Sequence, residues 1–248
     1  MDLLGAPTII GGVVERSFQV TGGREVVPGI LWTPAGATGP RPLVLVGHPL
    51  GGDKRTSHAL ALVDRVVDQA GWAVAAIDAI GHGDRALRSG VGGGDGGGGG
   101  VRAVTPAHLG AAGDACEEMA EDWTATLTAL RSLDDIGDGP VGYFGLSMGT
   151  VFGLAFLATA PAVRCAALGL MGTFGAVTPW ARAAPSVTCP VTFFVQRRDT
   201  LIRAAHAKAL YRSLGSTDKR LRANRGGHSE LPDKAFDTTT RFLCTHLR

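Results

Sequence analysis

The sequence predicts an α/β fold whose central sheet is mostly parallel, with helices on both faces. Short apolar runs recur along the chain, and stretches with helical periodicity separate them, which is the pattern of α/β sheets. The chain has 248 residues, of which 45% are apolar and 19% are charged. A single compact core can reach this length, so we expect one domain over residues 1–248.

The predicted sheet begins with an antiparallel hairpin and continues with buried strands. The runs Glu15–Thr21 and Glu25–Thr33 flank Gly22 and Gly23, a pair typical of a hairpin turn. Later runs lack polar alternation, which indicates strands covered on both faces of a parallel sheet. These runs are Pro42–His48, Trp72–Asp78, Val141–Leu146, Cys165–Leu170 and Val191–Gln196, and Lys219–Ala223 is predicted as the last strand.

Helices are predicted between these strands because apolar residues recur three or four positions apart. The segment Met148–Ala160 is apolar all round, so we expect the most buried helix there, ending before Pro161. Pro232 is expected to open a C-terminal helix. Two further helices carry the apolar stripes Leu60, Val63, Val67 and Ala70, and Met119, Trp123, Leu127 and Leu130.

Two connections between the predicted elements bear on access to the site. Residues 81–113 show no periodicity, and eight glycines lie within residues 92–100, so we expect a long loop that is flexible over about 90–101. The connection Met171–Pro190 is too short for a large cap domain. We therefore expect an open site without a helical lid.

Charge and cysteine content exclude several classes of protein and site. Lysine and arginine number 24 against 22 acidic residues, without blocks of like charge, which argues against nucleic acid or an anionic membrane as main partner. No apolar stretch reaches the ~18 residues of a membrane span, and we expect a cytoplasmic protein without a signal peptide. The four cysteines are far apart in the sequence, which favours free thiols over a disulfide framework or a zinc site. No metal motif such as HExxH occurs, and no cofactor is expected.

The segment 145–149 reads GLSMG and stands between a predicted strand and a predicted helix. This is the context of a GxSxG nucleophile elbow. Side chains two residues before and after Ser147 would clash in so tight a turn, which accounts for Gly145 and Gly149. The following helix directs N–H groups and its positive end at the reacting oxygen. Ser147 is therefore the candidate nucleophile.

A serine nucleophile needs a base, and the base needs an acid that orients it. His228 follows the last predicted strand, in a loop that can reach the elbow. Asp199 lies just beyond the strand Val191–Gln196, at a carboxyl end where the sites of α/β sheets form. Asp218 and Asp233 are alternative acids near in sequence, but Asp218 precedes its strand and belongs at the opposite edge. Asp199 is the predicted acid.

Two backbone N–H groups are predicted to form an oxyanion hole. One belongs to Met148, immediately after the nucleophile, and the other to the loop HPLGG at residues 48–52. Proline has no N–H, so the donor from this loop is expected to be Leu50 and not Pro49. His48 is expected to brace the loop.

The chain resembles the α/β-hydrolases, and within them the dienelactone-hydrolase-like and small carboxylesterase members. The resemblance covers nearly the whole chain, through the loop at 48–52, the DAIGHG segment at 78–83, the elbow, and the order Ser147, Asp199, His228. In that fold the segment at 78–83 shapes the wall of the site. Two features depart from the family: HP stands where many members have HG, and serine stands where dienelactone hydrolases proper use cysteine.

These features predict a serine hydrolase that cleaves carboxylic esters through an acyl-enzyme. A thioesterase, amidase or acyltransferase would use the same residues, and a non-catalytic binding protein is a remoter alternative. Phe174 and Trp180 either wall a small acyl pocket or pack onto the body of the protein. Without a large lid we expect short acyl chains, about two to six carbons. A small-molecule ester is the expected partner, and a homo-oligomer is left open.

Overall fold

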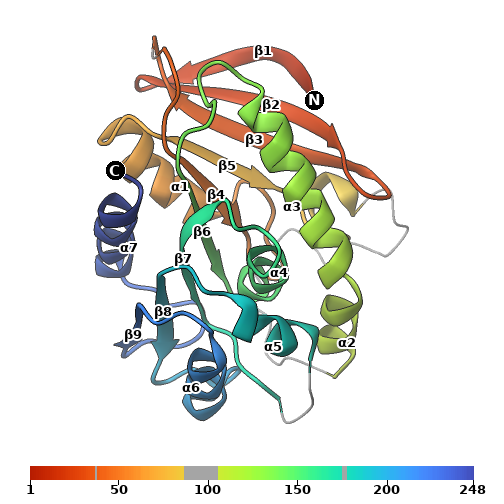
Figure 1. Cartoon of the computed structure of the whole chain (residues 1–248), viewed down its shortest axis with the longest axis vertical. Helices are drawn as coiled ribbons and strands as arrows, with labels where there is room; N and C mark the ends of the chain where they lie inside the picture. The colour runs from red at the N-terminus through yellow and green to blue at the C-terminus, as the bar shows by residue number, and fades with distance from the viewer. Residues whose placement is uncertain (37, 87–105, 175–177) are drawn as a thin grey trace.

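The computed structural model describes residues 1–36, 38–86, 106–174 and 178–248. Nine strands within these residues form one sheet: β1 (Asp2–Ile10), β2 (Val13–Thr21), β3 (Val26–Pro34), β4 (Leu43–Gly47), β5 (Ala73–Ile77), β6 (Val141–Leu146), β7 (Val163–Gly169), β8 (Val191–Gln196) and β9 (Lys219–Asn224). Their order across the sheet is β1-β2-β3-β5-β4-β6-β7-β8-β9 (Figure 1). The neighbouring pairs from β5-β4 to β8-β9 are parallel, so the predicted mostly parallel α/β sheet is confirmed.

The N-terminal strands pair antiparallel, as the hairpin prediction requires. β2 pairs with β3 along its whole length, and β3 joins the parallel part through β5. Every predicted strand is present with bounds within two residues of the predicted ones. β1, which the sequence analysis did not predict, extends the sheet beyond β2 with nine exposed residues.

Helices cover both faces of the sheet, as predicted. One apolar core lies between the sheet and the helices α3 (Cys116–Arg131), α4 (Met148–Leu157), α5 (Pro179–Ala183) and α6 (Ala204–Ser213). A second core lies under α1 (Ser57–Leu62), the π-helix that continues it (Val63–Asp68) and α7 (Asp233–His246). Nine of the ten residues of α4 are buried, which confirms the expectation of the most buried helix there among the described helices. The helix ends at Leu157, three residues before Ala160.

The expectation of a loop over residues 81–113 was wrong at both ends. A 3₁₀ turn spans Gly83–Arg85, and α2 spans Pro106–Asp114. Pro106 is pre-organised for the first position of a helix, and the alanines that follow favour helix, which outweighs the single glycines within it. The glycine-rich run that we expect to be flexible lies outside the described residues.

The four cysteines are free thiols, as predicted. Burial raises the pKa of the Cys116 thiol to about 12 and that of Cys189 to about 11. These thiols are therefore protonated and unreactive near neutral pH. No helix in the described ranges combines the length and the apolar character needed to cross a bilayer.

Candidate active site

Ser147 lies on a sterically tight turn between β6 and α4. Its backbone has φ 54° and ψ −118°, a conformation that residues other than glycine rarely adopt and that costs free energy. A Cβ atom at Gly145 would lie 2.4 Å from the carbonyl oxygen of Gly149, and one at Gly149 would lie 2.3 Å from the carbonyl oxygen of Gly47. The two elbow glycines are therefore required by close backbone contacts.

The elbow is tied to the neighbouring strand β7 by hydrogen bonds. The N–H of Ser147 donates to the carbonyl oxygen of Gly169 at 2.9 Å. The hydroxyl of Thr150 accepts the N–H of Gly169 at 2.9 Å, and lies 2.8 Å from the oxygen of Gly145 and 2.7 Å from that of Gly169. Sequence analysis missed Thr150. The one available signal was a threonine within a helix whose other residues are apolar or glycine.

The structure brings the three predicted site residues together from three loops. Nε2 of His228 lies 3.0 Å from Oγ of Ser147, and Nδ1 lies 2.7 Å from Oδ2 of Asp199. The other carboxylate oxygen of Asp199 accepts the N–H groups of Leu201 at 2.9 Å and Ile202 at 2.8 Å. With the carboxylate beside Nδ1, the proton belongs on Nδ1, and the lone pair of Nε2 faces the serine hydroxyl.

The loop that carries His228 is held mainly by Glu230 and the end of β8. Nε2 of Gln196 donates to the carbonyl oxygen of Glu230 at 2.7 Å, and the N–H of Gly227 donates to its carboxylate at 2.8 Å. The N–H of Arg198 donates to the oxygen of Gly226 at 3.1 Å. These bonds join the β9–α7 loop to the loop that carries Asp199, so His228 and Asp199 are positioned as one unit.

The two alternative acids contact other residues. The carboxylate of Asp218 lies 3.8 Å from Nε of Arg220 and 3.9 Å from Nε2 of His246. Asp233 begins α7 and lies 3.5 Å from a guanidinium nitrogen of Arg65. The geometry thus brings Asp199, and neither of these two, to His228.

The loop after β4 is braced against the loop after β5, as expected for His48. Nδ1 of His48 lies 2.9 Å from the oxygen of Pro49, and Nε2 accepts the N–H of Ala79 at 2.9 Å. Burial lowers the pKa of His48 to about 4, although its bond to Pro49 opposes the shift. His48 is therefore neutral at pH 7 and serves as a connector between the loops.

The two backbone N–H groups predicted to form the oxyanion hole belong to a turn after β4 and to the first residue of α4. Leu50 is the second residue of a β-turn closed by the bond from Gly52 N–H to Pro49 O at 3.0 Å. The third residue, Gly51, has φ +77°, which a type II turn requires. Met148 is the first residue of α4, so its N–H has no acceptor within the helix.

A largely buried ion pair lies at the start of the segment 78–83. The carboxylate of Asp78, which is fully buried, accepts the backbone N–H of Lys54 at 2.9 Å and its ammonium group at 2.6 Å. Burial alone would lower the pKa of Lys54, but its bonds to Asp78 and Asp84 raise it. A Cβ at Gly83 would lie 2.3 Å from this carboxylate, so glycine is required there. Lys54 was missed because its partner is 24 residues away.

The two predicted pocket residues differ in their exposure. Phe174 is partly buried, and its ring meets that of His206 edge-on, 5.6 Å between centroids. Trp180 is fully buried and donates its indole N–H to the oxygen of Gly172 at 3.1 Å. The role of both residues as walls of an acyl pocket stays a prediction.

A hollow of about 590 Å³ lies away from these residues, at the amino ends of β4 and β6. Its lining includes Pro42, Arg131 and Pro140, and no residue of the Ser147 cluster. It offers no nucleophile paired with a base, so the candidate site remains at the carboxyl ends of the strands. In the described part of the chain, no group of three histidine, cysteine or carboxylate side chains is arranged to hold a metal ion.

Comparison with known proteins supports the fold and the class of enzyme. Neither a family model nor a curated protein matches the chain. Among solved structures, a cold-adapted esterase from an Arctic intertidal metagenomic library is 31% identical, covers 100% of both chains and has a TM-score of 0.84.

Two more distant structures share the fold. A dienelactone hydrolase from Anabaena variabilis is 22% identical over 96% of this chain and 100% of its own, with a TM-score of 0.70. An acetyl xylan esterase from Paenibacillus sp. R4 is 15% identical over 99% of this chain and 88% of its own, with a TM-score of 0.72. The full-length match at 31% identity shows that the chain belongs to the esterases of the α/β-hydrolase fold.

Proposed function

We propose that the protein is a cofactor-independent serine hydrolase that cleaves carboxylic esters with short acyl chains. The observation that carries the proposal is the continuous hydrogen-bonded chain from Ser147 through His228 to Asp199. A base within 3.0 Å of the serine hydroxyl, itself held by a carboxylate, is the arrangement that activates a weak nucleophile. The full-length similarity to an esterase supports the same reaction class.

The proposed reaction proceeds in two acyl-transfer steps. Oγ of Ser147 bonds to the ester carbonyl carbon while Nε2 of His228 takes the hydroxyl proton. The N–H groups of Leu50 and Met148 stabilise the oxyanion, and Asp199 stabilises the imidazolium. The tetrahedral intermediate then expels the alcohol, which receives the proton from His228. Water repeats the sequence on the acyl-enzyme, releasing the acid and restoring Ser147.

The preference for short acyl chains is supported by the small connection between β7 and β8. Its described residues contain only α5 and one turn of 3₁₀ helix, which together span Pro179–Ser186. Each methylene group that is buried contributes about 0.8 kcal/mol, and a methylene beyond a small pocket contributes nothing. We propose that Phe174 contacts the acyl chain, with Trp180 as part of the supporting wall.

A series of p-nitrophenyl esters tests the proposal. We expect kcat/KM to be highest at about two to six acyl carbons, from the small pocket argued above. Ser147→Ala should lower turnover by about 10⁶-fold, whereas Ser229→Ala, an exposed serine beside the base, should leave it near the wild-type value. Full activity in Ser147→Ala would overturn the mechanism, and efficiency that still rises at long chains would overturn the acyl preference. Thioester and amide substrates with the same acyl group identify the preferred leaving group.

A further inference from the structure

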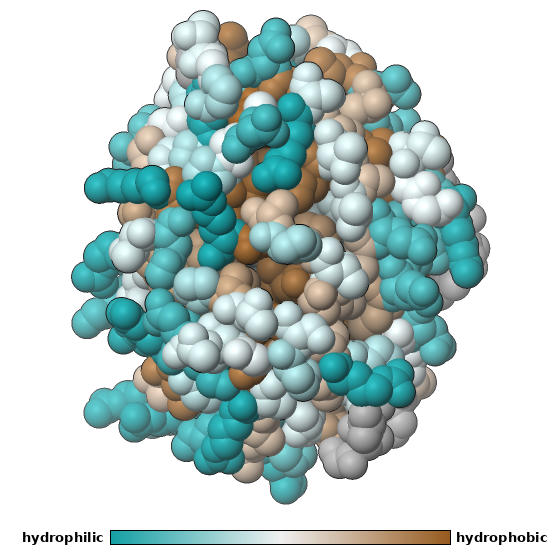
Figure 2. All heavy atoms as spheres, viewed as in Figure 1, coloured by the Kyte–Doolittle hydropathy of each residue, from teal (hydrophilic) through white to brown (hydrophobic). Residues whose placement is uncertain are grey.

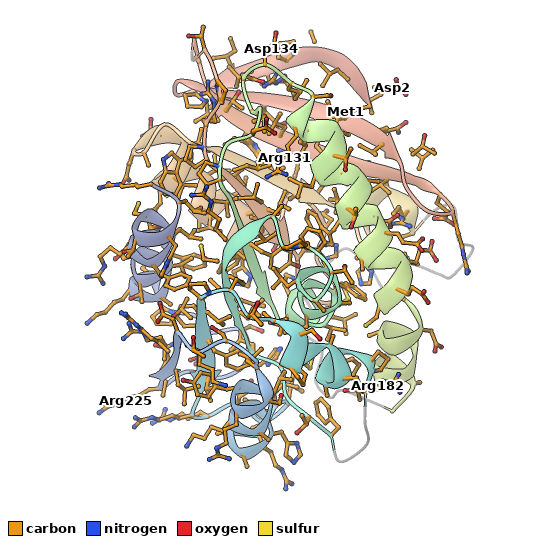
Figure 3. The ribbon with its side chains drawn as sticks, viewed as in Figure 1. Met1, Asp2, Arg131, Asp134, Arg182 and Arg225 are labelled. Atoms are coloured by element: carbon orange, nitrogen blue, oxygen red, sulfur yellow. The ribbon has the colours of Figure 1, made fainter. Side chains whose placement is uncertain are left out.

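β1 forms an edge of the sheet that is apolar and nearly uncovered. Four of its side chains keep large exposed fractions: Leu3 49%, Leu4 42%, Ile9 64% and Ile10 73%. In the described part of the chain only β2 packs extensively against it. Figure 2 shows apolar residues at the surface of the end of the molecule where Figure 1 places β1. Asp2, labelled in Figure 3, is the strand's one charged side chain.

The opposite edge of the same sheet has a different character. β9 carries Lys219, Arg220 and Arg222, and Arg225 follows it, extending from that side of the molecule in Figure 3. Charged side chains on an edge strand prevent other chains from pairing with it. The sheet is thus protected at β9 and open at β1, which indicates that the β1 edge is covered by a partner.

The β1 sequence is suited to pairing with a second copy of itself. Leu3 lies opposite Phe18 and Ile9 opposite Val14, so both side chains point to the same face of the sheet. If two β1 strands pair antiparallel about a two-fold axis at Ala6, Leu3 of each copy meets Ile9 of the other. Shifting this register by one residue would place these side chains on opposite faces.

The middle of β1 allows this register. The pairing with β2 is irregular between Leu4 and Thr8, where Gly5 has φ +68° and Pro7 lacks an N–H. Three regular residues remain on each side of the irregularity. In the register about Ala6, residues 2–4 of one copy lie opposite residues 8–10 of the other copy. The irregular residues 5–7 of the two copies then face each other.

We propose that the protein forms a two-fold symmetric dimer in which β1 of each copy pairs antiparallel with β1 of the other, joining the two sheets. Pairing β9 with β9 would bring its cations against those of a second copy. Pairing β1 with β9 would leave free edges and produce an open filament. A strand pair about 30 Å long buries on the order of 1,000 Å², at the lower end of specific interfaces, so the dimer dissociates on dilution.

Light scattering and sedimentation measurements test the proposal with the full chain. Over about a hundred-fold range of concentration, the wild-type mass should rise from 25.5 kDa toward twice that value. Leu3→Lys with Ile9→Lys brings like charges together and should keep the protein monomeric. Leu3→Lys with Ile9→Asp places opposite charges across the same contacts and should restore the dimer. Leu60→Lys, at an exposed leucine of α1, is the matched control and should dimerise as the wild type does.

The register has its own test. Ala6→Cys places two thiols at the two-fold axis, so mild oxidation should cross-link the dimer, while the wild type under the same conditions stays uncross-linked. Unchanged esterase activity and circular dichroism would show that each variant is folded. A wild type that stays monomeric at every concentration, or a dimer that persists in Leu3→Lys with Ile9→Lys, would overturn the proposal.

Discussion

The elbow carries Ser147 and the β9–α7 loop carries His228, and Oγ of Ser147 lies 3.0 Å from Nε2 of His228. The structure fixes these two segments by different means. At the elbow, backbone atoms of β4, β6 and α4 approach so closely that a side chain at position 145 or 149 would not fit. In the loop that carries His228, position depends on a few hydrogen bonds in which Glu230 accepts from Gln196 and from the N–H of Gly227, and Glu230 is exposed. The strained residue is Ser147, in the packed region.

This difference shows how stability and activity are divided in the site. The unfavourable backbone of Ser147 persists because surrounding packing determines it. The base lies in a region that tolerates change at little cost in stability. We therefore expect substitutions at the elbow to affect folding and activity together, and substitutions around His228 to affect mainly activity.

The largest effect among the supporting residues is expected for Asp199→Asn. An amide beside Nδ1 of His228 favours the tautomer that carries its proton on Nε2, which can no longer accept the serine proton. Turnover should fall by up to about 10⁴-fold with little change in the melting temperature. Asp218→Asn is the matched control and should be active. If Asp218→Asn inactivates the enzyme and Asp199→Asn does not, the acid has been misassigned.

Gly149→Ala tests the packed side of the comparison. Its new methyl group would lie 2.3 Å from the carbonyl oxygen of Gly47, a backbone atom that can move only with β4. We expect the free energy of unfolding to fall by about 3 kcal/mol, with a loss of activity, in urea titrations. Gly110→Ala, in α2 with open space around it, should keep full stability. Equal stability of the two variants would contradict the packing account.

His48 makes the loop beside the elbow sensitive to acid. The pKa of His48 in the folded protein is about 4 and lies below the usual histidine pKa of 6.5, so the unfolded chain binds more protons between these two pH values. The contribution of neutral His48 to the free energy of unfolding is complete above pH 6.5 and is lost as the pH falls toward 4. At pH 4.5 the loss is about 2 to 3 kcal/mol. His48→Gln should lack this part of the pH dependence, while His206→Gln should retain it. Identical profiles for His48→Gln and the wild type would refute the connector role.

The smallest effect is expected for Glu230→Ala, which removes the bond to Gly227 N–H. Because the loop is exposed, stability should change by about 1 kcal/mol or less. Turnover should fall several-fold, since His228 is less well positioned, and KM should change little. Ser229→Ala is the control in the same loop. A loss of stability without a change in turnover would place the loop with the packed region instead.

The parallel strands could be predicted because burial on both faces leaves uninterrupted apolar runs, as in Val191–Gln196. The proximity of Ser147, His228 and Asp199 could be predicted because each residue follows a strand at the same edge of the sheet. β1 could not be predicted, because its nine residues are exposed and no buried face imposes an alternation of apolar and polar residues. α2 was missed because the neighbouring glycines dominated the prediction.

The supporting contacts were beyond sequence analysis for a different reason. Thr150 bonds to Gly169, Lys54 to Asp78, and Gln196 to the backbone of Glu230. Each pair joins residues that are distant along the chain, and no local periodicity marks such a pair. His48 is the exception, because it stands in the loop that was predicted to supply a donor to the oxyanion hole.

Labelling with a fluorophosphonate tests most directly whether Ser147 is activated by His228. We expect one adduct per chain, located on Ser147 by peptide mass spectrometry, and loss of ester hydrolysis in step with labelling. Ser147→Ala should take up no label, and His228→Gln should react far more slowly than the wild type. A folded wild-type protein that stays unlabelled, or that hydrolyses esters while the label resides on another serine, would contradict the central claim.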